Sequence, residues 1–224
     1  MKALVFDLDG VLVDVSGSYR RAVKETFRYF AGRDIDDAGI EAYKGRGGLN
    51  NDWDLTHAAL CEQGLSVARE KVVEAFQRIY LGDRFNGLIK NERWLVRDEV
   101  LAGLREGYDL AIVTGRPGPE TRFTLTHFDV DRFFPVVITQ DDLPEGRGKP
   151  DPLGIRTALA ILGRTDGYYA GDTVDDMRAA AGAGLVPIGV VRGEDGRDAK
   201  EAGLLAAGAA RIVRDVNRIR EVLS

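Results

Sequence analysis

The chain begins Met1-Lys-Ala-Leu-Val-Phe-Asp-Leu-Asp-Gly-Val-Leu-Val-Asp14, in which a short apolar run ends in two carboxylates. The run from Ala3 to Phe6 is typical of a buried strand in a parallel sheet. Asp7 and Asp9 follow where such a strand leaves the sheet, and open α/β sheets bind ligands just outside those strand ends. An isolated Asp-x-Asp before a glycine also fits a simple turn. A functional interpretation therefore needs partners elsewhere in the chain.

Composition limits the classes of protein to which the chain can belong. Its 224 residues, 44% hydrophobic and 30% charged, predict a globular protein with one large domain or one domain carrying an inserted module. The net charge of −5 and the lack of a long basic block argue against nucleic acid or a membrane as partner. No signal peptide or membrane span is expected, and a cytoplasmic location is the simplest expectation. Cys61 is the only cysteine, so no internal disulfide forms and a buried, small apolar role is expected for it.

Residues 15–90 have helical periodicity and no convincing strand. The spacing of Tyr19, Val23 and Phe27 predicts a first helix that Gly32 ends. Further helices are expected around 34–43, 51–62 and 66–80, with a loop rich in Gly, Arg and Asn at 44–51.

From about residue 91 the pattern alternates between helices and strands, which predicts a parallel, doubly wound sheet. The strand at 3–7 must join this sheet because it has no other partner. We therefore expect an α/β fold with a Rossmann-like core formed by 1–14 and 91–224 and a helical cap, 15–90, inserted after the first strand. Strands are expected at 110–113, 136–139, 168–170, 186–191 and 211–213, and helices at 92–106, 118–128, 152–162, 174–182 and 215–223. The Ala- and Gly-rich stretch near 202–210 is expected to be a packed helix surface.

Three more polar clusters lie beyond predicted core strands. They are Thr114-Gly115-Arg116, Lys149 within Gly148–Pro152, and the acids from Asp172 to Asp176. Each alone fits a structural role as a turn, a solvated lysine or the acidic first turn of a helix. Because the carboxyl ends of parallel strands share one edge, we expect the clusters to meet there.

The combined chemistry of these clusters favours phosphoryl transfer. Clustered carboxylates resist joint ionisation unless a cation compensates them, and an oxygen-only donor set favours Mg²⁺. A hydroxyl, backbone N–H groups and a lysine suit the oxygens of a transferring phosphoryl group. An aspartate nucleophile with a second carboxyl as acid and base completes such a reaction in two steps. The Lys149 cluster is not a nucleotide P-loop, because Pro150 stands where that motif needs Ser or Thr.

These clusters resemble, in order, the four motifs of the haloacid dehalogenase superfamily. The helical insertion after the first motif resembles its C1-capped, phosphatase-like members, among them phosphoglycolate phosphatases and β-phosphoglucomutases. The resemblance covers nearly the whole chain and is carried by Asp7-Leu-Asp9-Gly-Val, Thr114-Gly115, Lys149-Pro and Gly171-Asp172-x-x-x-Asp176.

The resemblance implies a role for each catalytic residue. Asp7 would attack phosphorus and form an aspartyl-phosphate. Asp9 would protonate the leaving alkoxide and then deprotonate the water that hydrolyses the intermediate. Thr114 would hydrogen-bond the phosphoryl oxygens, and Lys149 would neutralise the charge that phosphate and Asp7 share.

The resemblance also implies a Mg²⁺ site. Asp7, Asp172 and the backbone carbonyl of Asp9 would ligate the ion, and Asp176 would position metal-bound water or Lys149. Asp175 is either a supporting residue or an ordinary acid in the first turn of a helix. An acid at Asp9 argues for phosphoryl chemistry over carbon–halogen cleavage, because a halide leaves without a proton.

Substrate contacts are expected mainly from the cap. By analogy with capped members, Lys44, Arg46 and Asn50 or Asn51 would reach the substrate, although this loop also fits an ordinary helix connection. Gly115 would offer its backbone N–H to the phosphoryl group. Arg116 would reach a second anionic group or lie solvated at the surface.

The expected substrate is a small phosphorylated metabolite. The segment Gly47–Asp54 faintly resembles an uncharacterised subgroup linked to histidine biosynthesis, which places histidinol phosphate beside phosphoglycolate. The leading function is a Mg²⁺-dependent phosphomonoester hydrolase. The alternatives are a phosphomutase and a non-catalytic binding protein of the same fold.

Overall fold

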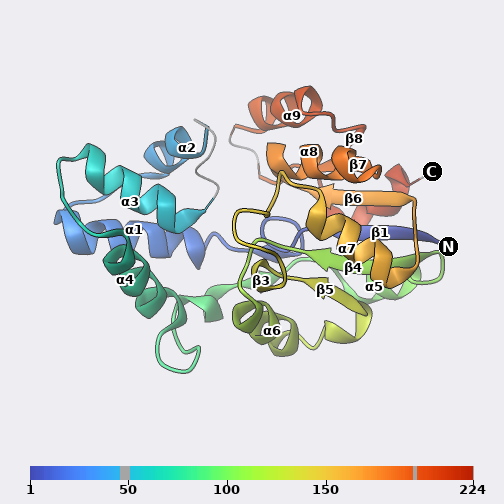
Figure 1. The fold of residues 1–224 in the computed structure, drawn as a ribbon, viewed down its shortest axis with the longest axis horizontal. Helices are drawn as coiled ribbons and strands as arrows, with labels where there is room; N and C mark the ends of the chain where they lie inside the picture. Colours follow the sequence, from blue (N-terminus) through green and yellow to red (C-terminus); the bar gives the residue numbers. More distant parts are fainter. Residues whose placement is uncertain (46–50, 194–195, 224) are drawn as a thin grey trace. The chain divides into compact units, whose positions relative to one another are not determined.

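A computed structural model describes residues 1–45, 51–193 and 196–223 of the chain (Figure 1). The chain divides into two compact units: unit 1 comprises Met1–Asp14 and Trp94–Ser224, and unit 2 comprises Val15–Arg93. The chain leaves unit 1 after β2 (Val13–Asp14) and returns through β3 (Arg93–Trp94). None of the described helices is both long and apolar enough to cross a membrane.

Unit 1 is built on a six-stranded sheet in the order β5-β4-β1-β6-β7-β8, and every neighbouring pair is parallel. The expected α/β doubly wound fold is confirmed. The first strand lies between β4 and β6, so the chain fills one side of the sheet before crossing to the other. The strands are β1 (Lys2–Phe6), β4 (Tyr108–Val113), β5 (Val136–Ile138), β6 (Gly167–Gly171), β7 (Val186–Val190) and β8 (Arg211–Val213).

The side chains of β1 alternate between the two faces of the sheet, as the pleat requires. Ala3 and Val5 pack into a buried cluster with residues of α7 and α8, such as Ile155 and Ala180. Leu4 and Phe6 are also fully buried, so both faces of the strand are covered. The helices of unit 1 are α5 (Asp98–Leu104), α6 (Gly118–His127), α7 (Leu153–Leu162), α8 (Val174–Ala183) and α9 (Arg197–Ala206), with 3₁₀ turns η2 (Asp131–Phe133), η3 (Gln140–Asp142) and η4 (Val216–Val222).

Unit 2 is helical, and α1 packs against both α3 and α4. Val23 and Phe27 of α1 and Val72 and Phe76 of α4 are buried. Gly32 ends α1 with a φ of 67°, a left-handed conformation that glycine adopts without strain. The elements are α1 (Tyr19–Ala31), α2 (Asp37–Gly45), α3 (Asp52–Glu62), α4 (Arg69–Leu81) and the 3₁₀ turn η1 (Leu88–Asn91).

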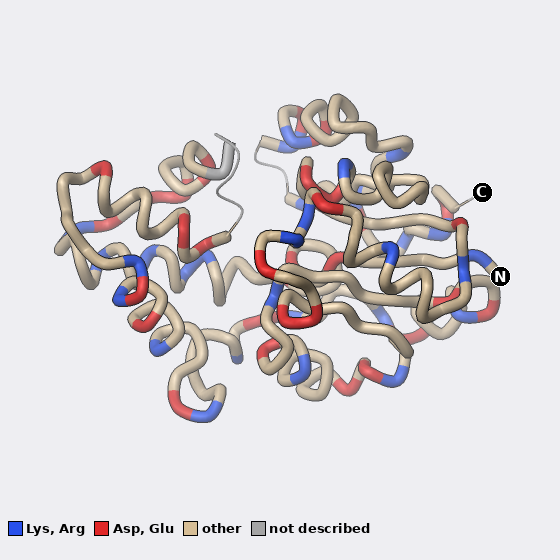
Figure 2. Tube along the Cα trace, in the orientation of Figure 1, with Lys and Arg blue, Asp and Glu red and all other residues tan. Residues whose placement is uncertain are grey.

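Positively and negatively charged residues are interspersed along the trace of each unit (Figure 2). In unit 2, exposed ion pairs link neighbouring elements, such as Lys24–Asp37 at 2.7 Å and Arg69–Asp54 at 2.6 Å. Exposed pairs of this kind stabilise a fold by less than about 1 kcal/mol each. Unit 2 is therefore held together mainly by its apolar helix faces.

Three details differ from the sequence-based expectation. The predicted helix at 92–106 is wrong over its first half, because β3 and an extended segment precede α5 and Leu95 donates its N–H to the carbonyl oxygen of Leu12 at 2.9 Å. The predicted helix at 215–223 is the 3₁₀ turn η4. The helix expected at 202–210 is α9, which begins earlier and ends at Ala206.

Candidate active site

Asp7 is the first residue beyond β1, and it is buried at the carboxyl edge of the sheet. Its N–H donates to the carbonyl oxygen of Ala170 at 2.9 Å, which ties this edge of β1 to β6. Burial raises the pKa of the Asp7 carboxyl well above its usual range; Lys149 opposes this shift and Asp176 adds to it. An ionised Asp7 therefore needs positive charge beside it.

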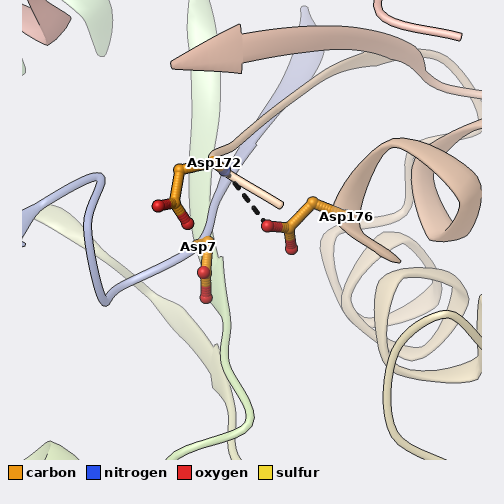
Figure 3. A group of neighbouring side chains, drawn as sticks. All are labelled: Asp7, Asp172 and Asp176. Atoms are coloured by element: carbon orange, nitrogen blue, oxygen red, sulfur yellow. Dashed lines mark hydrogen bonds between the residues drawn. The ribbon is translucent and has the colours of Figure 1, made fainter. Parts of the chain in front are cut away.

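Three carboxylates converge at this edge (Figure 3). Asp7 follows β1, Asp172 follows β6 and Asp176 lies in the first turn of α8; one oxygen from each lies within 4.8 Å of the others. Gly10 permits this approach with a φ of +77°, since a Cβ there would lie 2.5 Å from Oδ2 of Asp172. An anionic, all-oxygen donor set is the kind that Mg²⁺ prefers, so these residues fit that ion.

Asp176 is completely buried, and both of its oxygens accept hydrogen bonds. Oδ2 accepts from the backbone N–H of Asp172 at 3.1 Å and from the N–H and hydroxyl of Thr173 at 3.0 and 2.7 Å. Oδ1 accepts from Lys149 Nζ at 2.6 Å and from the Tyr169 hydroxyl at 3.0 Å. Burial disfavours the charge of Asp176, but Lys149 and the hydrogen bonds from Thr173 together outweigh it and lower the pKa of this carboxyl. Of the two roles expected for Asp176, these contacts favour holding Lys149.

Lys149 joins two of the carboxylates. Its Nζ lies 2.8 Å from Oδ1 of Asp7, 2.6 Å from Oδ1 of Asp176 and 3.3 Å from the Tyr169 hydroxyl. Burial works against the ammonium charge, but Asp176 and Asp7 outweigh it and raise the pKa of Lys149 well above its usual value. Lys149 therefore stays charged beside Asp7.

Thr114 and Gly115 follow β4 at the same edge. Thr114 is buried, and its N–H donates to the carbonyl oxygen of Ile138 at 2.9 Å. Its Oγ1 accepts a hydrogen bond from the N–H of Arg116 at 3.1 Å. Gly115 is exposed, and a Cβ built on it would meet nothing within 4 Å. This turn is therefore accessible to a bound group.

Arg116 points at Asp9. Its Nη2 donates to Oδ1 of Asp9 and its Nε donates to Oδ2 at 3.3 Å. The side chain of Arg116 has no exposed area, so the expectation that it lies solvated at the surface is wrong. Among the described residues, Asp9 does not belong to the convergent group of Asp7, Asp172 and Asp176.

The remaining predicted residues lie elsewhere or outside the described part of the chain. Lys44 lies near the end of α2 in unit 2, whereas Arg46 and Asn50 lie outside the described residues. Asn51 accepts the N–H groups of Trp53 and Asp54 at 2.8 and 3.4 Å as the N-cap of α3. The substrate contacts expected for Lys44, Arg46 and Asn50 or Asn51 stay predictions.

Three residues that contact the cluster were missed from the sequence. Thr173 caps α8 reciprocally with Asp176, and its spacing matches a capping box that sequence reasoning could have found. The position of Tyr169 could have been predicted from the period-two alternation of β6. This alternation places its side chain on the face of the sheet that also carries Ala3 and Val5. Lys200 of α9 places Nζ 2.8 Å from Oδ2 of Asp172, and no local pattern predicts that contact.

Replacement of Gly171 by alanine tests how tightly this cluster is packed. A Cβ at this position would overlap Cβ of Asp176. We expect Gly171→Ala to lower the free energy of unfolding by roughly 2–3 kcal/mol, as overpacking does. Gly107→Ala is the matched control, because a Cβ there meets nothing within 4 Å. Thermal unfolding that is equal for both variants would contradict the close approach.

A family model described as a haloacid dehalogenase-like hydrolase matches residues 1–184. This match covers most of the chain, and the site just described lies within it. The chain therefore belongs to the haloacid dehalogenase-like hydrolase family, as the four sequence motifs predicted, and it is an enzyme.

Individual relatives and solved structures are similar to most of this chain. An imidazoleglycerol-phosphate dehydratase of Phytophthora nicotianae is 38% identical over 85% of this chain, which spans only 43% of that relative's length. A phosphoglycolate phosphatase of Photorhabdus laumondii is 26% identical over 86% of this chain and 81% of its own length. The solved structure of a predicted phosphoglycolate phosphatase from Haemophilus somnus shares the fold, with a TM-score of 0.78, 22% identity and coverage of 99% of this chain and 97% of that one.

Proposed function

We propose that this enzyme is a Mg²⁺-dependent phosphatase that hydrolyses a small phosphomonoester through an aspartyl-phosphate at Asp7. The observation that carries the proposal is the grouping of Asp7, Lys149, Asp172 and Asp176 at the carboxyl ends of β1 and β6. Membership of the hydrolase family and the phosphoglycolate phosphatase relatives support it.

The chain's own residues divide the reaction into two steps. An oxygen of Asp7 attacks phosphorus while Asp9 gives its proton to the departing alkoxide. Asp9 then takes a proton from water, which attacks phosphorus and releases phosphate and the free Asp7 carboxylate. Thr114 and the N–H of Gly115 donate to the phosphoryl oxygens, and Lys149 balances the negative charge that accumulates beside Asp7.

Asp7 and Asp172 are the side chains that would hold Mg²⁺, with the backbone carbonyl of Asp9 as a further ligand. Oxygen atoms of Asp7 and Asp172 belong to the convergent group, whereas both oxygens of Asp176 already accept hydrogen bonds. Bound there, the ion would offset the carboxylate charge and polarise the phosphoryl group.

Removal of divalent metal tests this site. We expect a chelator to reduce phosphate release to background, and Mg²⁺ to restore it. Ca²⁺ should restore much less, because it prefers longer bonds and more ligands. Independently of activity, Mg²⁺ should raise the Tm of the wild type by binding the folded state, and Asp172→Asn should remove that shift. Full activity in excess chelator would contradict a metal-dependent mechanism.

Phosphoglycolate is the first substrate to test, because relatives of that name match most of the chain. Histidinol phosphate is the second, because the segment Gly47–Asp54 resembles a subgroup linked to histidine biosynthesis. The relative that is 38% identical, an imidazoleglycerol-phosphate dehydratase, supports this choice. A panel of small phosphomonoesters, scored by kcat/KM with Mg²⁺ present, ranks these against each other and against sugar phosphates. A mutase would instead convert a sugar monophosphate to its isomer in the presence of a bisphosphate primer, with little net release of phosphate.

We also propose that unit 2 acts as a cap in which Lys44 and Arg46 select the substrate. The basis is its insertion between β2 and β3, directly after the segment that carries Asp7 and Asp9. Substitution of Arg46 by methionine should raise KM for the preferred ester while leaving hydrolysis of p-nitrophenyl phosphate nearly unchanged.

A further inference from the structure

Arg116 is a buried cation whose guanidinium is directed at a carboxylate on the reaction edge of the sheet. Its side chain has no exposed area, whereas the Asp9 side chain is 30% exposed. Nη2 and Nε donate to the two different oxygens of Asp9. This two-point geometry fixes the plane of a carboxylate as well as its distance, which a lysine cannot do.

Arg116 is itself held in place from several sides. Its Nη1 donates to Oγ1 of Thr124 on α6 at 2.8 Å. Its backbone N–H donates to Thr114 Oγ1 at 3.1 Å, and its carbonyl oxygen accepts the N–H of Gln140 at 3.1 Å. The guanidinium is therefore held in one position, from which it can orient the partly exposed Asp9 side chain.

We propose that Arg116 is a positioning residue that fixes the orientation of the Asp9 carboxyl for proton transfer to and from the substrate. The inference rests on the proposed function, in which Asp9 is the acid and base. It replaces the sequence-based assignment of Arg116 to a second anionic group of the substrate, since its guanidinium is buried and already engaged by Asp9 and Thr124.

Leaving groups of different basicity separate this role from a purely structural one. Phenyl phosphate releases a basic phenolate, with a conjugate-acid pKa of about 10 as in tyrosine, and needs a proton donor. p-Nitrophenyl phosphate has nearly the same shape, but its phenolate leaves without one. The value of kcat/KM reports the first phosphoryl transfer, in which the leaving group departs. Loss of a well-placed acid should therefore affect phenyl phosphate much more strongly.

Arg116→Met is the principal variant. We expect it to lower kcat/KM for phenyl phosphate by roughly 10²-fold and for p-nitrophenyl phosphate by less than about 5-fold, within the range of general acid catalysis. Arg116→Lys should recover little, because lysine lacks the fork. Thr124→Val, which removes the acceptor of the Arg116 Nη1 hydrogen bond, should give the same selective loss at a smaller size. Arg164→Met breaks the 2.5 Å pair with Asp109, at the start of β4, and is the matched control.

Asp9→Asn separates failure of this inference from failure of the proposed function. Asp9→Asn should show the selective loss itself, and Arg116→Met added to it should cause little further selective loss, because the two act as a unit. If Asp9→Asn lowers both substrates equally, the acid role of Asp9 is wrong. If Asp9→Asn is selective but folded Arg116→Met and Thr124→Val lower both substrates equally or neither, the positioning role is wrong and the proposed function stands.

Discussion

Asp7→Asn is expected to abolish phosphate release, with kcat reduced by at least roughly 10⁴-fold, because an amide oxygen cannot form the acyl-phosphate bond. The variant should stay folded. Burial raises the pKa of Asp7 in the native state, so its ionised side chain carries a desolvation cost there. A neutral amide removes that penalty, and we expect the Tm of Asp7→Asn to be no lower than that of the wild type.

The control for Asp7→Asn is Asp109→Asn, a carboxylate of the same unit whose partner is Arg164. This variant should retain nearly full activity. Asp7→Asn with more than a few per cent of wild-type activity would contradict the nucleophilic role. A folded but inactive Asp109→Asn would show that loss of any core carboxylate disables the enzyme.

Lys149→Met should have the second largest effect, on stability as well as on activity. The substitution leaves Asp176 buried without its cation, which we expect to lower the free energy of unfolding by about 3 kcal/mol or more. It also removes the charge beside Asp7, so kcat should fall by roughly 10²–10³-fold, as for loss of one oxyanion donor. Urea unfolding and steady-state phosphate release measure the two effects separately.

A double variant distinguishes these two effects of Lys149. Lys149→Met with Asp176→Asn removes both charges of the buried pair and should regain part of the lost stability. Activity should stay low, since Asp7 still lacks its cation. Lys2→Met, an exposed lysine whose Nζ lies 5.4 Å from the Tyr168 ring centroid, should change neither quantity. Recovery of activity in the double variant would show that Lys149 serves only to offset Asp176.

The sequence was enough to predict the sheet because its signals are local. Short apolar runs ending in Asp7, Thr114 and Asp172 marked the parallel strands and the edge where their ends meet, and the sheet order places β1 between β4 and β6. The cluster of Asp7, Lys149 and Asp176 could be expected from that topology alone. Residues 92–97 were misassigned because their helical spacing competes with backbone pairing to a distant segment, which no local pattern encodes.

Individual side-chain partners were less predictable than the strands. The buried guanidinium of Arg116 donates to Asp9 and to Thr124 of α6, and the fold alone brings these two acceptors to it. The contact of Lys200 with Asp172 likewise joins helix α9 to the turn that follows β6, two segments far apart in the sequence. Cys61, expected to be buried, is exposed, because it lies on the outer side of α3 where Leu60 turns inward.

Direct trapping of the covalent intermediate tests the central claim about Asp7. The enzyme is mixed with Mg²⁺ and p-nitrophenyl phosphate, quenched within the first turnover and reduced with borohydride, which converts an aspartyl-phosphate to homoserine. Peptide mass spectrometry then reads residue 7. We predict homoserine at Asp7, only when substrate is present, and none in Asp7→Asn. Unmodified Asp7 during a burst of nitrophenolate, or modification at another residue, would contradict the account.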